Sequence, residues 1–221
     1  MSRVPNVSPA VGLVFDLDNT LIASHIDFAG MRRCVIDTLQ QADVPISAEQ
    51  MRWTIGRLAE LAKGPGLPDD LATRIWQIVD DFEVAGMEGA TLEPGASIAL
   101  STLYQRGYAM AVLTNNARAS ALRALKDQNL QRYFKVILCR DDVQRLKPAP
   151  DGLQAAARLL GNPKHLIMIG DSWLDAAAAA ATGARFVAVG RFRQVAEPLP
   201  VWKQISTLHE LPELDLPAPK G

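Results

Sequence analysis

The sequence predicts an α/β protein whose parallel sheet is covered by helices on both faces. From Leu92 onward, short apolar runs of strand length alternate with stretches of helical spacing. Several of these runs end in polar residues, as buried strands do where they emerge at the edge of a sheet. Residues 23–87 break this alternation and have the pattern of consecutive helices. We therefore expect a Rossmann-like, doubly wound parallel sheet (residues 1–22 and 88–221) with an inserted all-helical domain (residues 23–87).

The expected core elements are bounded by glycines and prolines, which typically mark helix ends. The expected strands are Val11–Phe15, Tyr108–Leu113, Phe134–Cys139, His165–Ile169 and Arg185–Val189. The expected helices run from Pro94 to Gly107, from Ala117 to Gln128, from Pro150 to Gly161 and from Leu174 to Thr182, the last rich in alanine. After Arg191 we expect an edge strand at Val201–Ile205, a short helix capped by Ser206, and a frayed, proline-rich tail from Leu211 to Gly221.

The inserted region has the signals of three helices. The first spans Met31–Ala42, a capping box at Ser47–Gln50 opens the second, and Pro68–Asp70 opens the third. The third places its apolar residues on one face, namely Leu71, Ile75, Ile78, Val79 and Phe82. Such an insert suggests a separate small lid, and the alternative is a set of helices that pack on the sheet as part of one body.

Asp16 and Asp18 follow the first apolar run and are the most informative pair in the chain. In a parallel sheet, the edge where such a strand ends is where ligands bind. Two carboxylates so close together repel unless they share a cation or a proton. The pair therefore indicates a metal-assisted nucleophile beside a general acid/base. The alternative is a strand-to-turn junction in which these side chains make only turn hydrogen bonds.

Three further polar clusters lie at or beyond the ends of later apolar runs. They are Thr114-Asn115-Asn116, Lys147-Pro148-Ala149-Pro150 and the segment from Gly170 to Asp175. With the segment Val14–Leu21, these clusters form an ordered set that resembles the haloacid dehalogenase superfamily, in particular its phosphatase branch similar to phosphoglycolate phosphatases. The resemblance extends from about Val11 to Val189, most of the chain.

The resemblance implies a role for each member of the set. Asp16 is the expected nucleophile, which forms an aspartyl-phosphate, and Asp18 is the expected general acid and then base. Mg²⁺ is expected on Asp16, on the backbone carbonyl of Asp18 and on Asp171, because it prefers hard oxygen ligands. Asp175, four residues after Asp171, is expected on the same helical face and in support of the metal or its waters.

The remaining expected roles concern the phosphoryl group. The Thr114 hydroxyl and the Asn115 backbone N–H are expected to bind its oxygens, and Lys147 to neutralise its charge and that of Asp16. Taken alone, Thr114 also fits an ordinary turn, and Lys147 fits a surface lysine before a proline. Asn19 stands where the family most often has glycine, and asparagine tolerates the left-handed backbone that such a turn needs.

An aspartate at position 18 selects among the chemistries of the superfamily. By resemblance, the dehalogenases and the phosphonate-cleaving branch lack this carboxylate, and the metal-pumping ATPases carry threonine there. Asp18 therefore points to a Mg²⁺-dependent phosphatase of a small phosphorylated metabolite, phosphoglycolate-like or sugar-phosphate-like. The alternatives are a phosphomutase, whose lid could use Arg57 and Lys63 as phosphate contacts, and a non-catalytic binding protein that keeps the fold.

Composition narrows the remaining expectations. The chain is 48% hydrophobic with net charge −1, and it contains no basic run typical of nucleic-acid binding. No apolar stretch is long enough to span a bilayer, and the first residues lack the apolar core of a signal peptide. The expected protein is cytoplasmic, acts on a small molecule rather than on nucleic acid or membrane, and is a monomer or small homo-oligomer. The family resemblance implies that the helical insert, residues 23–87, is a cap domain.

Overall fold

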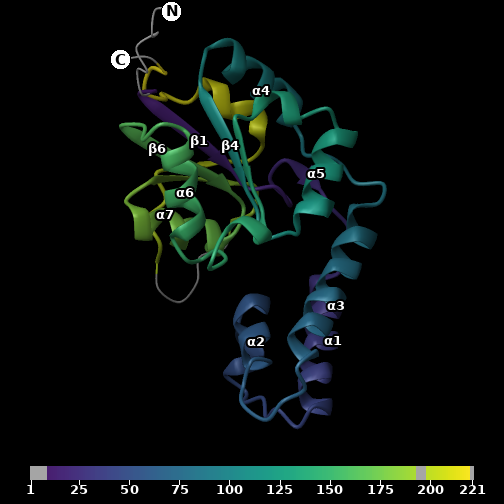
Figure 1. The fold of residues 1–221 in the computed structure, drawn as a ribbon. Coiled ribbons are helices and arrows are strands. Elements are labelled where there is room, and N and C mark those ends of the chain that lie inside the picture. The colour runs from purple at the N-terminus through teal and green to yellow at the C-terminus, as the bar shows by residue number, and fades with distance from the viewer. Residues whose placement is uncertain (1–8, 193–197, 220–221) are drawn as a thin grey trace, which may run out of the picture. The chain divides into compact units, whose positions relative to one another are not determined.

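A computed structural model describes residues 9–192 and 198–219 of the chain (Figure 1). Its contacts divide the chain into two compact units. One unit is formed by the residues up to Ala23 together with those from Thr91 onward, and it contains the sheet. The other unit is Ser24–Ala90 and contains helices α1 to α3. Its bounds lie close to the helical insert predicted at residues 23–87.

The sheet has six strands, all paired in parallel, in the order β5-β4-β1-β6-β7-β8. The central strand β1 has β4 on one side and β6 on the other. The strands that follow β1 in the chain are therefore added first on one side of it, as β4 and β5, and then on the other, as β6, β7 and β8. This order is typical of a doubly wound sheet, the fold class that the sequence predicts. The strands are β1 (Val11–Phe15), β4 (Ala109–Leu113), β5 (Val136–Leu138), β6 (His165–Gly170), β7 (Arg185–Val189) and β8 (Lys203–Ile205), with a separate antiparallel pair, β2 (Ile22–Ala23) and β3 (Thr91–Leu92).

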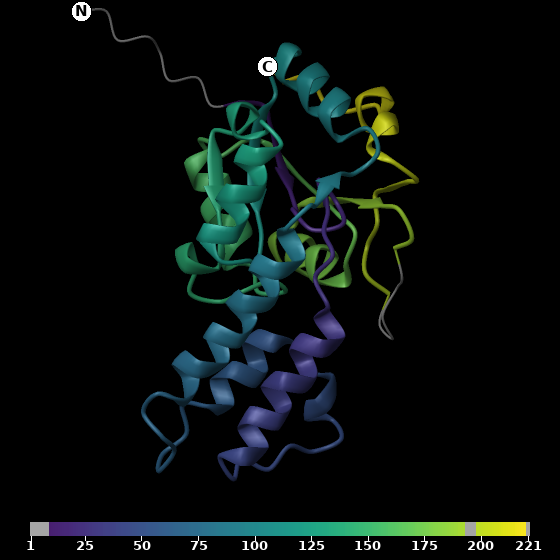
Figure 2. The ribbon, with the colours of Figure 1, turned by 90° about the vertical axis from the view of Figure 1, so that its right-hand side faces the viewer.

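Helices cover both faces of the sheet (Figures 1 and 2). Helices α6 and α7 contact each other, and both pack on strands of the sheet. Helix α4 packs with the 3₁₀ helix Leu208–Glu213. The helices of this unit are α4 (Ala96–Gln105), α5 (Arg118–Asp127), α6 (Asp151–Leu159) and α7 (Trp173–Thr182), and its further 3₁₀ turns are Gln131–Tyr133 and Arg140–Asp142.

Burial of the central strands explains their continuous apolar sequences. Every residue of β1 and β4 is buried, as expected for parallel strands covered on both faces. Helix α7 packs on β6 and β7 through small side chains, and Ala176, Ala178 and Ala179 are fully buried. The alanine run is therefore a helix that lies close against the sheet, as predicted.

The helical unit differs from the prediction at two helix starts. Helix α1 (Phe28–Gln41) begins before Met31, because the Asp27 carboxylate accepts a hydrogen bond from the Gly30 N–H at 2.8 Å and caps it. The capping box of Ser47 and Gln50 forms both of its hydrogen bonds, at 2.7 and 3.2 Å. It opens only a single 3₁₀ turn, Gln50–Arg52, so the prediction that an α-helix begins there is wrong.

The extended backbone of Trp53 ends that turn, and Thr54 is the N-cap of α2 (Ile55–Leu61). The third helix, α3 (Leu71–Met87), follows Asp70 as predicted and contacts α1. A Cβ on Gly86 of α3 would lie 2.4 Å from the Ile26 Cα, so the close approach of these two segments requires glycine.

The C-terminal segment is packed rather than frayed over its described residues, which end at 219. Thr207, not Ser206, is the N-cap of the 3₁₀ helix that follows, and Leu208 and Leu211 are fully buried. The Pro217 carbonyl accepts a hydrogen bond from the Tyr108 hydroxyl at 3.0 Å. The sequence carries little signal of this packing, because the apolar residues of the segment are few and stand among prolines. Residues 220 and 221 lie outside the described part.

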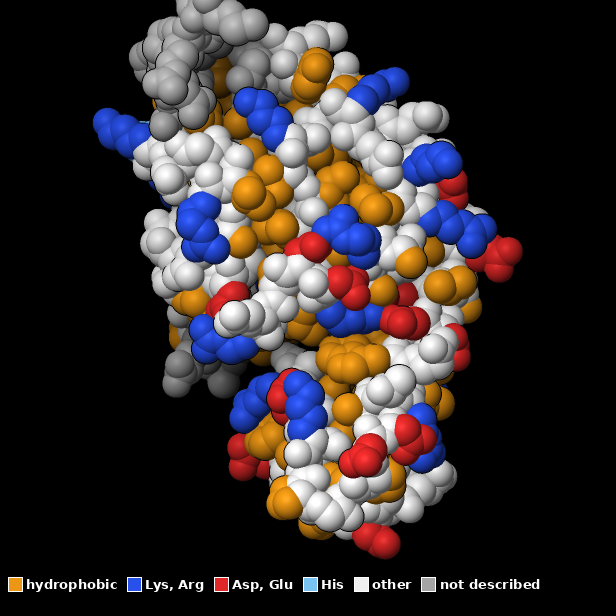
Figure 3. Space-filling view, in the orientation of Figure 1, with side chains coloured by type: hydrophobic (Ala, Val, Ile, Leu, Met, Phe, Trp, Pro, Cys, Tyr) orange, Lys and Arg blue, Asp and Glu red, His pale blue; other side chains and the backbone are white. Residues whose placement is uncertain are grey.

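Basic and acidic side chains are interspersed on the face of the molecule seen in Figure 3. This mixture is consistent with the net charge of −1. Among the described residues, every helix is too short or too polar to cross a membrane.

Truncation of Leu211 tests the packing of the C-terminal segment. Because Leu211 is fully buried, Leu211→Ala should lower the free energy of unfolding by about 2–5 kcal/mol. Leu159→Ala is the matched control, since Leu159 is 61% exposed and its truncation should change stability by less than about 0.5 kcal/mol. Urea unfolding of both variants measures the difference, and equal values would contradict a packed C-terminus.

Candidate active site

The three central strands present polar residues at one edge of the sheet. Asp16 follows β1, Thr114 follows β4 and Asp171 follows β6. The backbone ladder continues into these residues, since the Asp16 N–H donates to the Ile169 carbonyl at 2.9 Å. Ligands of open α/β sheets bind at this edge, beside the strand where the order reverses. The topology therefore brings together three of the four clusters singled out in the sequence.

The turn after Asp16 has the backbone that its sequence predicts. Asn19 has φ 54°, in the left-handed region, so asparagine adopts the conformation for which glycine is the usual residue. The Leu17 carbonyl accepts hydrogen bonds from the N–H groups of Leu21 and Ile22, both at 2.9 Å. The turn is thus closed around Leu17, and Asp18 is held within it.

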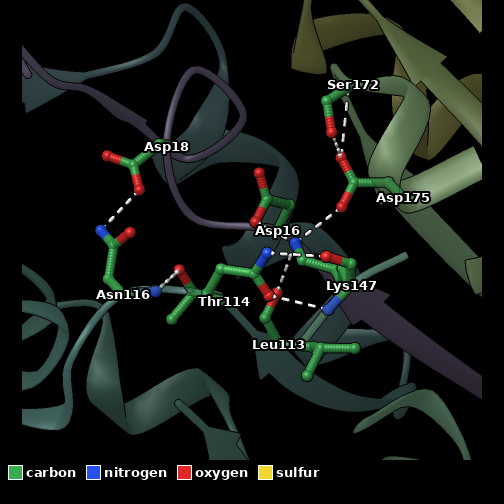
Figure 4. A network of polar contacts seen from close by, with 9 residues as sticks. Asp16, Asp18, Leu113, Thr114, Asn116, Lys147, Ser172 and Asp175 are labelled. Carbon is green, nitrogen blue, oxygen red and sulfur yellow. Dashed lines mark hydrogen bonds and ion pairs between the residues drawn. The ribbon is translucent and has the colours of Figure 1, made fainter. Parts of the chain in front are cut away.

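Lys147 joins the separate segments of the site (Figure 4). Its ammonium donates to Asp16 Oδ1 at 2.5 Å, to Asp175 Oδ1 at 2.6 Å and to the Leu113 carbonyl at 3.0 Å. An ammonium has three protons to donate, and these contacts use all of them. The Lys147 side chain is 4% exposed, so the alternative of a surface lysine is wrong.

The charge of Lys147 is maintained by its two carboxylate neighbours. Burial by itself lowers the pKa of a lysine, but Asp16 and Asp175 together outweigh burial and raise the pKa of Lys147 above its usual value. Lys147 is therefore a permanent cation, and its ammonium contacts the last residue of β4. Asp16 and Asp175 share this one positive charge.

Asp175 holds Lys147 from the first turn of α7. Its side chain is fully buried, and its Oδ2 accepts hydrogen bonds from the Ser172 N–H at 3.2 Å and the Ser172 hydroxyl at 2.6 Å. A Cβ on Gly170 would lie 2.5 Å from the Asp175 Cγ, so the carboxylate reaches this position only because residue 170 is glycine. The prediction that Asp171 and Asp175 lie on the same face of a helix is wrong, because Asp171 lies in the turn before α7.

The Asn115 side chain fixes the backbone of Lys147. Its amide nitrogen donates to the Lys147 carbonyl, and its amide oxygen accepts from the Lys147 N–H, both at 3.0 Å. This paired contact imitates a strand ladder and sets the direction in which the Lys147 side chain leaves the loop. The role predicted for Asn115 concerned only its backbone N–H, so these side-chain contacts with Lys147 were not predicted.

Thr114 and Asn116 complete the loop after β4. Thr114 is 1% exposed, and its hydroxyl oxygen accepts from the Asn116 N–H at 3.1 Å. A hydroxyl that accepts in this way keeps its own proton to donate. The Asn116 amide nitrogen donates to Asp18 Oδ2 at 2.6 Å (Figure 4). No role was predicted for Asn116, whose only signal in the sequence is its place beside Thr114 in the polar cluster.

The carboxylates of the site exceed its positive charge. Carboxylate oxygens of Asp16, Asp171 and Asp175 lie within 4.8 Å of one another. Asp18, two residues after Asp16 in the sequence, is also buried. Burial, and next the charge of Asp175, raises the pKa of Asp16 well above its usual value and that of Asp171 to about 7. Such a cluster favours a bound cation, which removes the repulsion.

The donor set fits Mg²⁺, which prefers carboxylate and carbonyl oxygens. Both oxygens of Asp175 already accept hydrogen bonds from Lys147 and Ser172. Asp16 and Asp171 are therefore the better candidates to hold the ion.

Comparison with known proteins identifies the family. Residues 13–189 match the model of the haloacid dehalogenase-like hydrolases. The chain belongs to this family. It is 33% identical over 189 residues to a phosphoglycolate phosphatase of Rhodobacter capsulatus (80% of this chain, 83% of the relative) and 30% identical over 228 residues to one of Shigella dysenteriae (96% and 89%).

Solved structures of this family share the fold. A haloacid dehalogenase-like hydrolase from Bacteroides fragilis superposes with a TM-score of 0.68 at 25% identity, over 91% of this chain and 99% of that chain. The protein CbbY from Rhodobacter sphaeroides, solved in complex with phosphate, gives a TM-score of 0.66 at 22% identity, over 90% and 95%. The predicted α/β fold and the predicted place in the phosphatase branch are both confirmed, and the chain is a hydrolase.

Replacement of Asp171 tests the charge imbalance in the metal-free protein. The pKa of Asp171 is raised to about 7 in the folded protein, so folding disfavours ionisation of this carboxyl. Its contribution to stability is complete below about pH 4 and is lost as pH rises from about 4 through 7. In excess chelator, Asp171→Asn should therefore be more stable than the unchanged protein at pH 8, by about 1 kcal/mol or more, and should lose this advantage near pH 4.

Thermal unfolding at several pH values measures this difference. The exposed Asp215→Asn is the matched control and should follow the unchanged protein at every pH. Added Mg²⁺ should raise the Tm of the unchanged protein and leave that of Asp171→Asn almost unaltered. A lower Tm of Asp171→Asn at pH 8 in chelator would show that the site tolerates its negative charge without a metal.

Proposed function

We propose that the protein is a Mg²⁺-dependent phosphatase that hydrolyses a small phosphorylated metabolite through an aspartyl-phosphate intermediate. The contact between Lys147 Nζ and Asp16 Oδ1 supports this proposal, because the proposed nucleophile then lies against a buried cation at the edge of the sheet where ligands bind. The relatives named phosphoglycolate phosphatase support the reaction class.

In the first step Asp16 attacks phosphorus and the bond to the leaving oxygen breaks. Phosphoryl transfer requires mainly an aligned nucleophile and stabilisation of charge on the phosphoryl oxygens. Lys147 keeps Asp16 oriented through Oδ1 and opposes the effect of burial on its pKa. The Thr114 hydroxyl, buried directly after β4, donates its proton to a phosphoryl oxygen. The Asn115 backbone N–H is the second proposed donor.

Asp18 transfers protons in both steps. It gives a proton to the leaving oxygen in the first step and accepts one from the water that hydrolyses the aspartyl-phosphate in the second. A carboxyl at this position allows rapid release of the phosphoryl group to water. This step separates a phosphatase from family members that keep the intermediate.

The proposed metal ligands are the carboxylates of Asp16 and Asp171 and the backbone carbonyl of Asp18. When bound, Mg²⁺ supplies positive charge against the phosphoryl oxygens and the nucleophile. Asp175 contributes indirectly, because it holds Lys147 and accepts from Ser172. We further propose that the helical unit Ser24–Ala90 is the cap of the enzyme and supplies the contacts that select the substrate.

A phosphate-release assay tests the proposal with phosphoglycolate, several sugar phosphates and nitrophenyl phosphate as substrates. We expect hydrolysis of at least one small phosphate ester with Mg²⁺, its loss in excess chelator, and poor recovery with Ca²⁺, whose larger and looser shell misplaces the nucleophile. Asp16→Asn should lower turnover by roughly 10³-fold or more. Asp215→Asn should be unchanged.

Two results would contradict the proposal. Full activity in excess chelator would exclude the metal assignment, and near-normal turnover of Asp16→Asn would exclude the covalent step. Analysis of the products separates the phosphomutase alternative, since a mutase returns an isomeric sugar phosphate instead of inorganic phosphate.

A further inference from the structure

We propose that Asn116 positions Asp18 for proton transfer and fixes which carboxyl oxygen carries the proton. This inference rests on the acid/base role proposed above for Asp18. The Asn116 amide nitrogen lies 2.6 Å from Asp18 Oδ2, and the two residues are 5% and 8% exposed. A short hydrogen bond to a carboxylate in a buried site is a strong orienting contact.

The Asn116 side chain can orient Asp18 because the backbone of Asn116 is held on both sides. Its N–H donates to the Thr114 hydroxyl oxygen at 3.1 Å. Its carbonyl accepts from the N–H of Arg140, the first residue of the 3₁₀ turn after β5, at 2.9 Å. The amide therefore projects from a fixed point at the end of β4 toward the turn after β1, as Figure 4 shows.

The two neighbouring asparagines of this loop have different partners. Asn115 binds the backbone of Lys147, and Asn116 binds the side chain of Asp18. One loop after β4 thus sets the position of both the cation beside the nucleophile and the proposed acid/base.

The chemistry of the amide decides the place of the proton. The Asn116 NH₂ group only donates, so Asp18 Oδ2 is an acceptor in this contact. The transferable proton is therefore assigned to Oδ1. In the first step the Oδ1–H bond breaks and the proton moves to the leaving oxygen as its bond to phosphorus breaks. In the second step the water oxygen bonds to phosphorus, a proton of that water moves to Asp18 Oδ1, and the bond between phosphorus and the Asp16 carboxylate breaks, which releases inorganic phosphate.

The contact with Asn116 holds the Asp18 carboxyl in place for this transfer, so its effect is largest for leaving groups that need protonation. Alkyl phosphates release a basic alkoxide, whereas nitrophenyl phosphate releases a phenolate that needs little help.

A double-mutant cycle tests this inference with the full chain and Mg²⁺. Asn116→Ala, Asp18→Asn and the double variant are compared in single turnovers that follow release of the leaving group from phosphoglycolate and from nitrophenyl phosphate. General acid catalysis is typically worth ~10²–10⁴-fold, so Asn116→Ala should slow release from the alkyl ester by roughly 10–100-fold and from the nitrophenyl ester much less. It should cause no further loss in the Asp18→Asn background.

A second variant controls for the possibility that Asn116→Ala loses activity because it does not fold. Asn116→Ser keeps a polar side chain and both backbone hydrogen bonds, but it is too short to reach Oδ2. It should therefore show the same selective loss as Asn116→Ala. Thermal unfolding of each variant identifies any that is not folded.

The outcomes separate this inference from the proposed function. Equal losses with both esters, or the same loss with Asp18→Asn already present, would show that Asn116 only supports the loop. Faster release in Asn116→Ala would show that Asn116 holds Asp18 away from the substrate. If Asp18→Asn itself shows no preference for the alkyl ester, the acid/base role of Asp18 fails, and the assignment of Asn116 fails with it.

Discussion

The site depends on one buried cation, the ammonium of Lys147, placed between the carboxylates of Asp16 and Asp175. A buried carboxylate without a partner is costly, and several so close together repel one another. Lys147 compensates part of this negative charge and joins three segments that are far apart in the sequence. Asp16 can therefore remain buried at the end of β1, and the remaining charge favours a divalent cation.

Several local features of the chain follow from the placement of this ammonium. Gly170 leaves the space that Asp175 needs to approach it, and Ser172 satisfies the second oxygen of Asp175. Asn115 clamps the Lys147 backbone, so the side chain leaves its loop in a fixed direction. The buried Leu113 carbonyl, at the end of β4, accepts the last ammonium proton. Strand ends, a helix start and a loop thus form one rigid network.

The sequence predicted the sheet and the main site residues well because these depend on local signals. Continuous apolar runs mark buried strands, and polar clusters at their ends mark the ligand-binding edge. The contacts of Asn116 with Asp18 and of Asn115 with Lys147 were missed because they join residues distant in the sequence. The C-terminal segment was expected to fray because proline suggests irregular backbone, while Leu208 and Leu211 carry its packing. Local signals do not report such tertiary contacts.

Lys147→Met is the most direct test, because it removes the buried cation and keeps a side chain of similar length. Without metal, this variant should lose about 3–5 kcal/mol of stability at pH 8. The loss should shrink near pH 5, since protonation of Asp16 and Asp171, whose pKa values are raised, relieves the unpaired charge. Urea unfolding at both pH values measures it. A loss that is the same at pH 5 and pH 8, or no loss at all, would show that the Lys147 ammonium does not compensate the buried carboxylates.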